Sequence, residues 1–466
     1  MSHMKELFIA QTPEKIDQIV ELYAWVDTKR DHKKVIFLDL RDRTGIIQAV
    51  GNETLREASS GDVVKVTGLI KNRPERLINP KIPTGAIEME IQEFEILNKS
   101  ETSPIPLDTS GEEIDEEIRL KYRYLDLRRE RMSRMLKLRS DYIYELRQIL
   151  HEKKFTEVET PILTKSTKEG ARDFLVPARL QPGKFYALPQ SPQQYKQLLM
   201  VSGVERYFQF ARCIRDEDLR ADRGFEHTQL DLEMSFVNRD DVMNTVEEMV
   251  KKAVTAVGGK LQLPKFPVID YHDAIAKYGA DKFDLRTEQE KEEGVLAFAW
   301  VINFPFFKKV DRADRAEVSD GKSGWTFTHN PFSMPIPEHL DWHMKGENIE
   351  KITTTQYDLV CNGFEAGGGS IRAHKPEILK ATYKIMGYSE EETQAGVGHM
   401  IEAFGYGAPP HGGIALGIDR HVMVLGNQKS LKEAIAFPMS SSGKTAVMDA
   451  PSAVSAEQLK ELGIKI

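Results

Sequence analysis

The chain has 466 residues, of which 40% are hydrophobic and 29% charged, with a formal net charge of −8 at pH 7. This length predicts two or three domains, and the composition is typical of a soluble globular protein. The longest apolar run, residues 295–307, is too short and too interrupted to cross a bilayer, which excludes a membrane-spanning protein. The acidic balance argues against bulk, non-specific binding to nucleic acid such as DNA.

The sequence contains few signals of cellular location. The N-terminus lacks a basic segment followed by an apolar core, so we expect no signal peptide. Cys213 and Cys361 are the two cysteines of the chain. Two thiols predict neither a disulfide framework nor a structural zinc site, and they suit a reducing compartment. We therefore expect a cytoplasmic protein with no membrane partner.

The first hundred residues contain short apolar segments separated by turn signals. These segments are residues 21–26, 34–42, 44–50, 62–70 and 86–97. Five strands with such loops predict a five-stranded OB barrel, which we assign to a domain at residues 1–100. A generic β-barrel is the alternative.

A linker and a helix follow the barrel. Residues 98–115 are polar, rich in Pro, Ser and Thr, and without periodicity, so we place a linker at residues 101–120. From residue 117 to about 154 apolar residues recur every three or four positions, which predicts a helix packed on one side. Its apolar stripe consists of Met132, Met135, Leu138, Tyr142, Leu146 and Ile149.

The remainder predicts one large domain, residues 121–466. Residues 155–163 predict a strand ended by Pro161, whose missing N–H confines it to a strand end or a sheet edge. Strands and helices then alternate without a regular βαβ rhythm. This pattern favours an α+β fold with an antiparallel sheet flanked by helices.

Residues 206–236 are the most informative segment. They predict two strands joined by a charged turn, and the second strand alternates apolar residues with His227, Gln229, Asp231 and Glu233. Such a polar face lines a site or simply faces solvent. Two later segments favour the site: residues 363–372 read GFEAGGGSIR, and residues 412–420 read GGIALGIDR.

Together these segments resemble motifs 2 and 3 of the class II aminoacyl-tRNA synthetases, and of bacterial-type aspartyl-tRNA synthetases in particular. The helix before residue 155 and the strand at 155–163 resemble motif 1, through which that family dimerises. The resemblance covers nearly the whole chain. It implies a homodimeric ligase that uses ATP with Mg²⁺, L-aspartate and tRNA-Asp. No P-loop Lys-Ser/Thr pair and no HIGH or KMSKS signature is present.

Formation of an aminoacyl adenylate joins a carboxylate to the α-phosphate of ATP, so the site needs fixed cations. The resemblance implies that Arg215 contacts the α-phosphate and the substrate carboxylate, and that Arg420 holds the γ-phosphate end. The alternatives are a surface arginine ending a strand and a helix-terminus ion pair. The ATP-binding set that the resemblance implies is Arg215, Asp216, Glu217, Glu365, Gly417, Ile418, Asp419 and Arg420.

Asp358 and Glu365 lie seven residues apart, beside the glycines at 367–369. Two carboxylates near ATP would repel it unless Mg²⁺ bridges them to the phosphates. The resemblance implies this metal role, and three glycines in a strand suggest close approach by a ligand. Ordinary strand carboxylates are the alternative.

Two cations in an amino-acid pocket predict a carboxylate side chain, and Arg372 suits a bidentate grip while Lys196 adds a point charge. The aspartate-binding set implied by the resemblance is Glu169, Gln193, Lys196, Arg215, Asp231, His329, Ser370 and Arg372. For His329, a purely structural role is an equal alternative. Lysyl relatives need an acidic residue where Arg372 stands. Asparagine would leave a buried charge imperfectly paired.

The barrel carries the expected RNA contacts. Arg30, Phe37 and Gln48 match anticodon-contacting positions of the aspartyl family, with barrel core as the alternative for Phe37. His32 stands where relatives that read only tRNA-Asp carry leucine. In relatives that charge both tRNAs, the residue at this position occurs together with a glycine in a later loop, which we take as Gly85. We therefore expect a non-discriminating enzyme that also charges tRNA-Asn.

Two departures from the bacterial aspartyl pattern stand out. The large insertion between motifs 2 and 3 is replaced by a short segment, residues 282–298, and Gly224 stands where relatives carry a glutamine that contacts ATP. Alternatives to the aspartate ligase are an asparagine ligase, an RNA-free paralogue that makes only the adenylate, and a non-catalytic tRNA-binding or regulatory paralogue. The RNA-free paralogue should lack the barrel, and the non-catalytic one should lack Arg215, Glu365 or Arg420.

Overall fold

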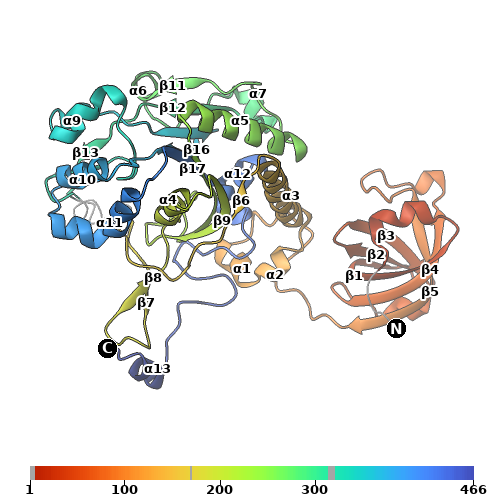
Figure 1. Ribbon diagram of the computed structural model, residues 1–466. Coiled ribbons are helices and arrows are strands. Elements are labelled where there is room, and N and C mark those ends of the chain that lie inside the picture. Colours follow the sequence, from red (N-terminus) through yellow and green to blue (C-terminus); the bar gives the residue numbers. More distant parts are fainter. Residues whose placement is uncertain (1–5, 168–170, 313–320, 466) are drawn as a thin grey trace. The chain divides into compact units, whose positions relative to one another are not determined.

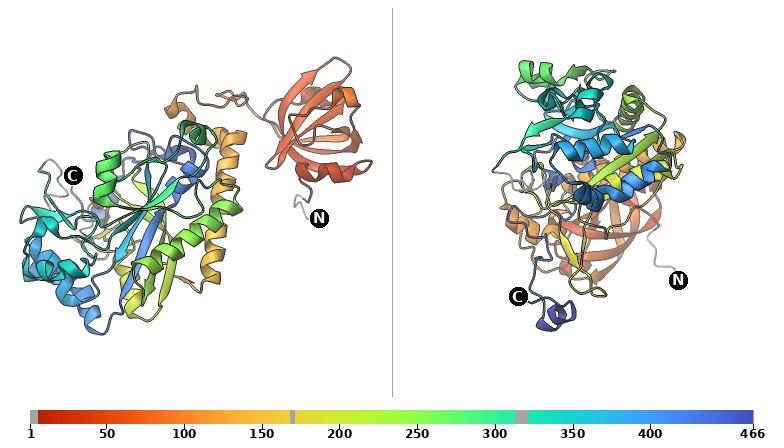
Figure 2. Two further views of the ribbon diagram at one scale, coloured as in Figure 1. Left: turned by 90° about the horizontal axis from the view of Figure 1, so that it is seen from above. Right: turned by 60° about the vertical axis from the view of Figure 1, so that its left-hand side comes forward.

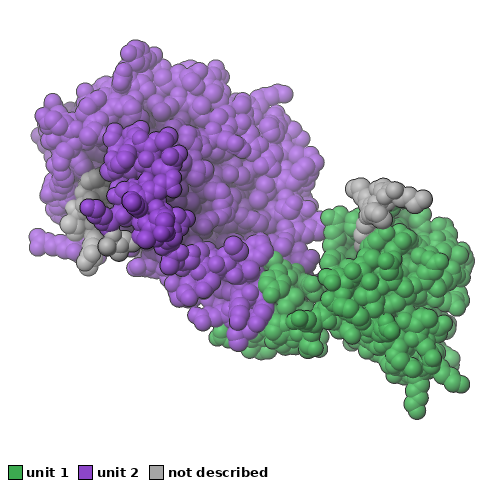
Figure 3. All heavy atoms as spheres, turned by 90° about the horizontal axis from the view of Figure 1, so that it is seen from below, with its two compact units in different colours: residues 1–115, 124–129 green, residues 116–123, 130–466 purple. Residues whose placement is uncertain are grey.

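The computed structural model describes residues 6–167, 171–312 and 321–465. The chain divides into two compact units, residues 1–115 with 124–129 and residues 116–123 with 130–466 (Figure 3). In the described part of the chain, no helix is long and apolar enough to cross a membrane.

The first unit is a closed five-stranded barrel, in the order β1-β2-β3-β5-β4 (Figure 1). Its strands are β1 (Ile19–Asp31), β2 (Ile36–Asp42), β3 (Gly45–Gly51), β4 (Val63–Asn72) and β5 (Ile87–Asn98), with 3₁₀ helices η1 (Ile9–Lys15), η2 (Glu53–Glu57) and η3 (Glu75–Leu77). Alternate residues point inward, so Ile36, Leu38 and Leu40 are buried in the core while Phe37 and Asp39 lie on the outer face. The predicted barrel is confirmed.

The second unit contains an eight-stranded sheet in the order β11-β12-β15-β16-β17-β10-β9-β6. The strands are β6 (Thr156–Glu157), β9 (Arg206–Ile214), β10 (Glu226–Ser235), β11 (Val268–Asp270), β12 (Phe298–Ile302), β15 (Tyr357–Cys361), β16 (Phe364–Ile371) and β17 (His411–Gly417). Two small hairpins, β7 (Leu175–Pro177) with β8 (Phe185–Ala187) and β13 (Phe307–Lys309) with β14 (Trp325–Phe327), stand apart from it.

The α+β fold class is confirmed, with one correction to the sheet. Its central strands are antiparallel, but β11 pairs with β12 and β6 pairs with β9 in parallel. The sheet is therefore mixed at both edges.

Helices flank the sheet on both sides (Figures 1 and 2). The α-helices are α1 (Glu116–Lys121), α2 (Arg123–Asp126), α3 (Glu130–Glu152), α4 (Gln193–Val201), α5 (Arg239–Ala256), α6 (Tyr271–Tyr278), α7 (Glu288–Glu292), α9 (Leu340–Lys345), α10 (Pro376–Ile385), α11 (Glu390–Gly405), α12 (Ile418–Leu425) and α13 (Ala456–Glu461), and the 3₁₀ helices are η4 (Pro337–His339), η5 (Ile349–Lys351) and η6 (Leu431–Glu433). Helices α3, α5 and α12 share one core with the apolar face of β10, where Leu230 and Leu232 are fully buried. The polar face of β10 therefore points to the other side of the sheet, away from these three helices.

Two predictions around the first long helix need correction. The helix expected from residue 117 to 154 is divided into α1, α2 and α3, because the chain turns so that the buried Arg123 donates to the carbonyls of Ile435 and Ala436. The strand expected at residues 155–163 is reduced to β6, which is two residues long. Val158 still donates to the Phe208 carbonyl, but beyond it the segment runs toward Pro161 without strand pairing. The apolar stripe of α3 is buried as expected except at Leu138, which is partly buried against the same core.

Candidate active site

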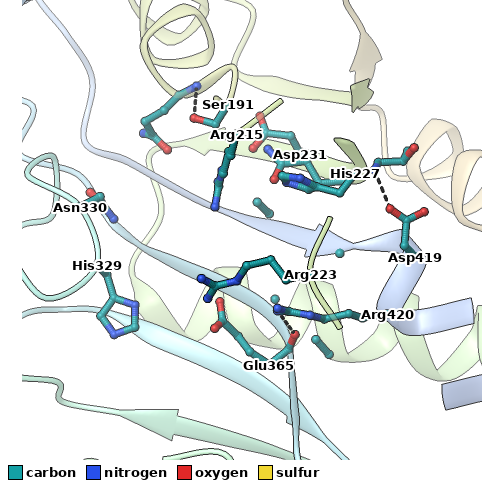
Figure 4. A pocket seen from close by; sticks show the side chains of 18 of the residues that line it. Ser191, Arg215, Arg223, His227, Asp231, His329, Asn330, Glu365, Asp419 and Arg420 are labelled. Carbon is teal, nitrogen blue, oxygen red and sulfur yellow. Dashed lines mark hydrogen bonds between the residues drawn. The ribbon is translucent and has the colours of Figure 1, made fainter. Parts of the chain in front are cut away.

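A pocket of about 300 Å³ lies over the polar face of β10 and the neighbouring strands β16 and β17 (Figure 4). His227, Gln229 and Asp231 line it from β10, and Gln229 and Asp231 are more than nine-tenths buried. The alternating strand therefore presents its polar residues to a pocket, and the solvent-facing alternative is wrong.

Most of the predicted site residues meet in this pocket. Its lining includes Gln193, Lys196, Arg215, Glu217, Asp231, His329, Glu365, Arg372, Gly417, Asp419 and Arg420. Asp216 does not line it and instead pairs with Arg172 at 3.4 Å, and Ile418 is fully buried in the core. Glu169 falls outside the described residues. The roles expected of these side chains remain predictions.

Arg215 and Arg420 both point into the pocket (Figure 4). Arg215 follows the end of β9, and its Nε donates to the Gln190 carbonyl at 3.2 Å; no carboxylate among the described residues forms an ion pair with it. Arg420 lies in the first turn of α12, donates to the Glu365 carbonyl at 3.0 Å and pairs with Asp222 at 3.3 Å. A cation gains nothing from the dipole at this end of a helix. Both positions suit an anionic ligand better than a structural role.

Arg372 and Lys196 lie deep in the pocket, but neither is unpaired. Arg372 Nε bonds Glu233 Oε1 at 2.9 Å, and Lys196 Nζ lies 2.7 Å from Asp231 Oδ1 and 3.2 Å from Glu233 Oε2. All four side chains are at most 2% exposed. Glu233 belongs to the same polar strand face but was not among the predicted site residues, and the structure adds it to the cluster.

Burial and the neighbouring charges shift the pKa values of Asp231 and Glu233 in opposite directions. Burial raises the pKa of Asp231, and Lys196 only partly offsets it. Burial also opposes ionisation of Glu233, but Arg372 and Lys196 outweigh it and hold the pKa of Glu233 below its usual range. Asp231 Oδ2 is buried without a hydrogen-bond partner among the described residues. This acceptor can therefore take a hydrogen bond from a ligand.

Ser370, Gln193 and His329 have different positions. Ser370 is fully buried outside the lining, where its hydroxyl accepts from Arg372 Nη1 at 2.9 Å and so supports the arginine. Gln193 begins α4 and donates to Gln197 at 3.0 Å. His329 follows β14 and lies with Nδ1 3.8 Å from Asp358 Oδ2, so it stands beside the predicted metal carboxylate.

Asp358 on β15 and Glu365 on β16 face one another across Gly368. A Cβ at Gly368 would lie 3.0 Å from Asp358 Oδ1 and 3.4 Å from Glu365 Oε1. Asp358 Oδ2 is buried without a hydrogen-bond partner among the described residues, and burial together with the Glu365 charge raises the pKa of Asp358 to about 6. Paired carboxylates with an unsatisfied oxygen suit a hard cation such as Mg²⁺.

The three glycines of β16 have two explanations. A Cβ at Gly367 would meet Leu416 Cδ2 at 2.4 Å, and one at Gly369 would meet the Gly413 carbonyl at 2.1 Å. These two glycines let β16 approach β17. Gly368 points the other way, toward Asp358 and Glu365, and leaves room in the pocket.

The predicted set of site residues omitted several residues of the pocket lining. The lining also contains Ser191, Asp222, Arg223, Gly224, His227, Gln229, Asn330 and Gln356. Burial, with the charges of Arg215 and Arg420, lowers the pKa of His227 to about 3, so this imidazole is neutral. The alternation of β10 already indicated His227 and Gln229, whereas nothing local to the sequence indicated Gln356 or Asn330.

The barrel carries the predicted RNA-contacting residues on its outer face. Arg30 pairs with Asp39 at 2.6 Å and donates to Gln48 Oε1 at 3.3 Å, and Gln48 Nε2 donates to Glu88 at 2.9 Å. These contacts fix a polar ladder across β1, β2, β3 and β5. In the antiparallel pairing of β2 with β3, Asp39 lies opposite Gln48.

Phe37 is half-buried on that outer face, which excludes the barrel-core alternative. The exposed His32 meets the Phe37 ring edge-on, with centroids 5.8 Å apart. A Cβ at Gly85 would lie 1.8 Å from the Asn79 carbonyl oxygen, so its turn requires glycine for a steric reason independent of any RNA.

Two family models match the chain. The model for tRNA synthetases class II (D, K and N) covers residues 115–441, and that for an OB-fold nucleic acid binding domain covers residues 20–97. Among solved structures, the asparaginyl-tRNA synthetase of Pyrococcus horikoshii with asparaginyl-adenylate aligns with a TM-score of 0.74 at 22% identity, covering 93% of this chain and 98% of that chain. A putative aspartyl-tRNA synthetase of Leishmania major aligns with a TM-score of 0.72 at 20% identity, covering 92% and 91%. At these identities the likeness concerns the fold.

Other relatives have a higher sequence identity to this chain. The aspartate–tRNA(Asp/Asn) ligase of Corynebacterium jeikeium is 39% identical over 579 aligned residues, which cover 97% of this chain and 96% of that protein. That of Rhodococcus erythropolis is 38% identical over 576, covering 97% and 95%. Both alignments are longer than the 466 residues here, so these relatives carry residues that this chain lacks. The chain belongs to the class II tRNA synthetases (D, K and N).

Proposed function

We propose that this protein is an aspartate–tRNA ligase that forms aspartyl-adenylate from L-aspartate and ATP and then transfers the aspartyl group to tRNA. The observation that carries this proposal is one pocket that brings two arginines together with a buried cluster of two cations and two carboxylates. Arg215 and Arg420 line the pocket, and Arg372 and Lys196 lie buried with Glu233 and Asp231. The names of the relatives at 38–39% identity support the same activity.

In the first step, the α-carboxylate of aspartate attacks the α-phosphate of ATP and pyrophosphate leaves. Arg215 would bring the two anions together and stabilise the charge that develops on the phosphorus oxygens, and Arg420 would hold the outer phosphates. Asp358 and Glu365 would hold Mg²⁺, which neutralises phosphate charge when bound. In the second step, a hydroxyl of the terminal tRNA ribose attacks the carbonyl of the adenylate and AMP leaves.

Aspartate is assigned to the buried cluster, where its ammonium and its β-carboxylate would each meet a group of opposite charge. The unsatisfied Asp231 Oδ2 would accept from the α-ammonium, and Arg372 would share its guanidinium between Glu233 and the β-carboxylate. Gln193, His329 and Glu169 are proposed to complete the substrate contacts. Asparagine would offer Arg372 an uncharged amide in place of a second carboxylate and should therefore bind more weakly.

We assign anticodon binding to the barrel, residues 1–100, joined by a linker at 101–120 to the catalytic domain at 121–466. Arg30, Phe37 and Gln48 would contact the anticodon. His32 would admit tRNA-Asn as well as tRNA-Asp, in line with the Asp/Asn naming of the relatives. Gly85 supports this assignment less than His32 does, because its turn requires glycine for a steric reason.

We also propose a homodimer in the cytoplasm. The helix α3 and residues 155–163 leave large apolar side chains uncovered, with Tyr144 at 55%, Ile162 at 47% and Leu163 at 52% exposure. Exposed apolar side chains of this size are common at protein–protein interfaces where they gather in one patch. A fully active monomer in light scattering would contradict the dimer.

The test is ATP–pyrophosphate exchange with aspartate, asparagine and lysine in parallel, followed by charging of tRNA-Asp and tRNA-Asn transcripts. We expect exchange with aspartate alone and charging of both transcripts. Faster exchange with asparagine would make the protein an asparagine ligase. Exchange with aspartate but no charging of either transcript would indicate an enzyme that makes only the adenylate, and no exchange at all would indicate a non-catalytic paralogue.

A further inference from the structure

Lys282 contacts a predicted metal-binding carboxylate. Its Nζ lies 2.8 Å from Glu365 Oε2, and its side chain is 43% exposed. Lys282 begins the short segment of residues 282–298 that precedes and enters β12. Lys282 was not among the predicted site residues.

The fold holds Lys282 in this place through its neighbour. Phe283 is 6% exposed in a cluster with Ala299 and Val360, and its carbonyl accepts from the Gly363 N–H at 3.0 Å. Gly363 lies in the turn between β15 and β16, directly before the strand that carries Glu365. The backbone of the short segment is thus attached to the turn beside the carboxylate.

The two oxygens of Glu365 have different surroundings. Oε2 pairs with Lys282, whereas Oε1 faces Gly368 and the Asp358 carboxylate. Lys282 is thus a cation in contact with a carboxylate, and it supplies charge that a divalent cation would otherwise supply.

We propose that Lys282 is an exchangeable counter-cation for Glu365, which it leaves for the ATP phosphates when Mg²⁺ and ATP enter together. This role rests on the proposed function. A cation already paired with Glu365 makes binding of the metal alone unfavourable, because the carboxylate must first give up its partner. When ATP arrives, its phosphates offer the released ammonium a new anion. Lys282 then couples metal binding to nucleotide binding and acts as a positioning residue.

The test measures Mn²⁺ binding to the full chain by electron paramagnetic resonance, with and without α,β-methylene ATP. Lys282→Met should bind Mn²⁺ about tenfold more tightly without nucleotide, the scale of one pKa unit of charge interaction. The gain in Mn²⁺ affinity caused by the nucleotide should shrink by a similar factor. Lys282→Arg should behave as the parent does. The matched control is Lys291→Met, which removes a surface partner of Glu288 in the same segment.

Unchanged or weaker Mn²⁺ binding by Lys282→Met without nucleotide would overturn the proposal, provided that circular dichroism shows the parent fold; Lys282→Gln serves if the Met variant does not fold. Absence of Mn²⁺ binding to the parent even with nucleotide would reject the metal site and this role with it. Parent enzyme that shows the coupling but no exchange with aspartate would reject the proposed function and leave the role of Lys282 in place.

Discussion

At the scale of single residues, the buried pair of Arg372 and Glu233 has two consequences. The same guanidinium that is proposed to read the substrate also neutralises a carboxylate that is fully buried. Removing one member of such a pair leaves a charge without a partner in a medium that solvates it poorly. A variant at Arg372 therefore tests folding as well as specificity.

Arg372→Leu should lower the free energy of unfolding by about 3 to 5 kcal/mol, because Glu233 loses its main partner. Urea denaturation measures this. Changing both residues to leucine should recover part of the loss, since no unpaired charge remains. Lys137→Leu removes one side of an exposed pair with Asp141 and should change stability little, by about 0 to 1 kcal/mol. Equal stability of Arg372→Leu and the parent would mean that the buried pair contributes nothing.

Arg215→Ala and Arg420→Ala should each slow adenylate formation by about 10² to 10³ fold, the typical loss when a preorganised site loses one charge-stabilising donor. ATP–pyrophosphate exchange measures this rate. The far-ultraviolet circular dichroism and the urea midpoint should stay near those of the parent, because both side chains are only partly buried at the pocket. Near-normal exchange in both variants would remove these residues from the catalytic site.

At the scale of elements, β16 separates packing from binding by the alternation of its side chains. Gly367 and Gly369 lie against β17, and Gly368 faces the carboxylates between them. One residue along the strand changes which face a side chain would occupy. Neighbouring substitutions should therefore have different consequences.

Gly369→Ala should destabilise the sheet, because its Cβ would meet the Gly413 carbonyl oxygen at 2.1 Å. Gly368→Ala should leave stability close to that of the parent but weaken Mn²⁺–ATP binding, since the added methyl group lies between Asp358 and Glu365. Thermal unfolding and calorimetric titration read the two effects separately. Loss of stability in Gly368→Ala with intact metal binding would reverse this assignment.

The contact between α9 and α10 predicts a dependence of stability on pH. The His343 Nε2–H donates to the Ile378 carbonyl at 3.2 Å, and Nδ1 has no partner among the described residues. Burial lowers the pKa of His343 to about 4, whereas an imidazole in the unfolded chain titrates near 6.5. Between these values the unfolded state binds more protons, so stability falls as the pH falls from 6.5 toward 4.

From pH 7 to pH 5 the parent should therefore lose roughly 2 kcal/mol more stability than His343→Gln, which cannot take up this proton. Urea midpoints at the two pH values measure the difference. The exposed His272 provides the control, because His272→Gln should follow the parent. Parallel pH profiles of the parent and His343→Gln would show that His343 is not held neutral.

At the scale of the whole molecule, amino-acid activation and tRNA choice depend on different units. The pocket residues all belong to the second unit, and His32 and Phe37 belong to the first. His32→Leu should therefore shift charging toward tRNA-Asp and leave pyrophosphate exchange unchanged. Discrimination at a single base is worth only about 1 to 3 kcal/mol, so a shift of about 10 to 100 fold is the expected range. A parent enzyme that already prefers tRNA-Asp several hundredfold would refute the non-discriminating assignment.

Several features could be predicted from local periodicity alone. Alternation along β10 predicted its polar face, on which Asp231 lies and which lines the pocket. The strand-to-helix change at Gly417 placed Arg420 at the start of α12. These features follow from the geometry of a single strand or helix, which a short stretch of chain already specifies.

Which charges meet depends on the tertiary structure. Glu233 lies 139 residues from Arg372, and Lys282 lies far in sequence from Glu365, so no local pattern could pair them. The same holds for Asp216, which is adjacent to Arg215 yet pairs outside the pocket. The short β6 is also a tertiary result, because a strand exists only where a neighbour accepts and donates its hydrogen bonds. Charge pairing and strand pairing depend on approach between distant segments, and that approach is fixed by the packing of the whole sheet.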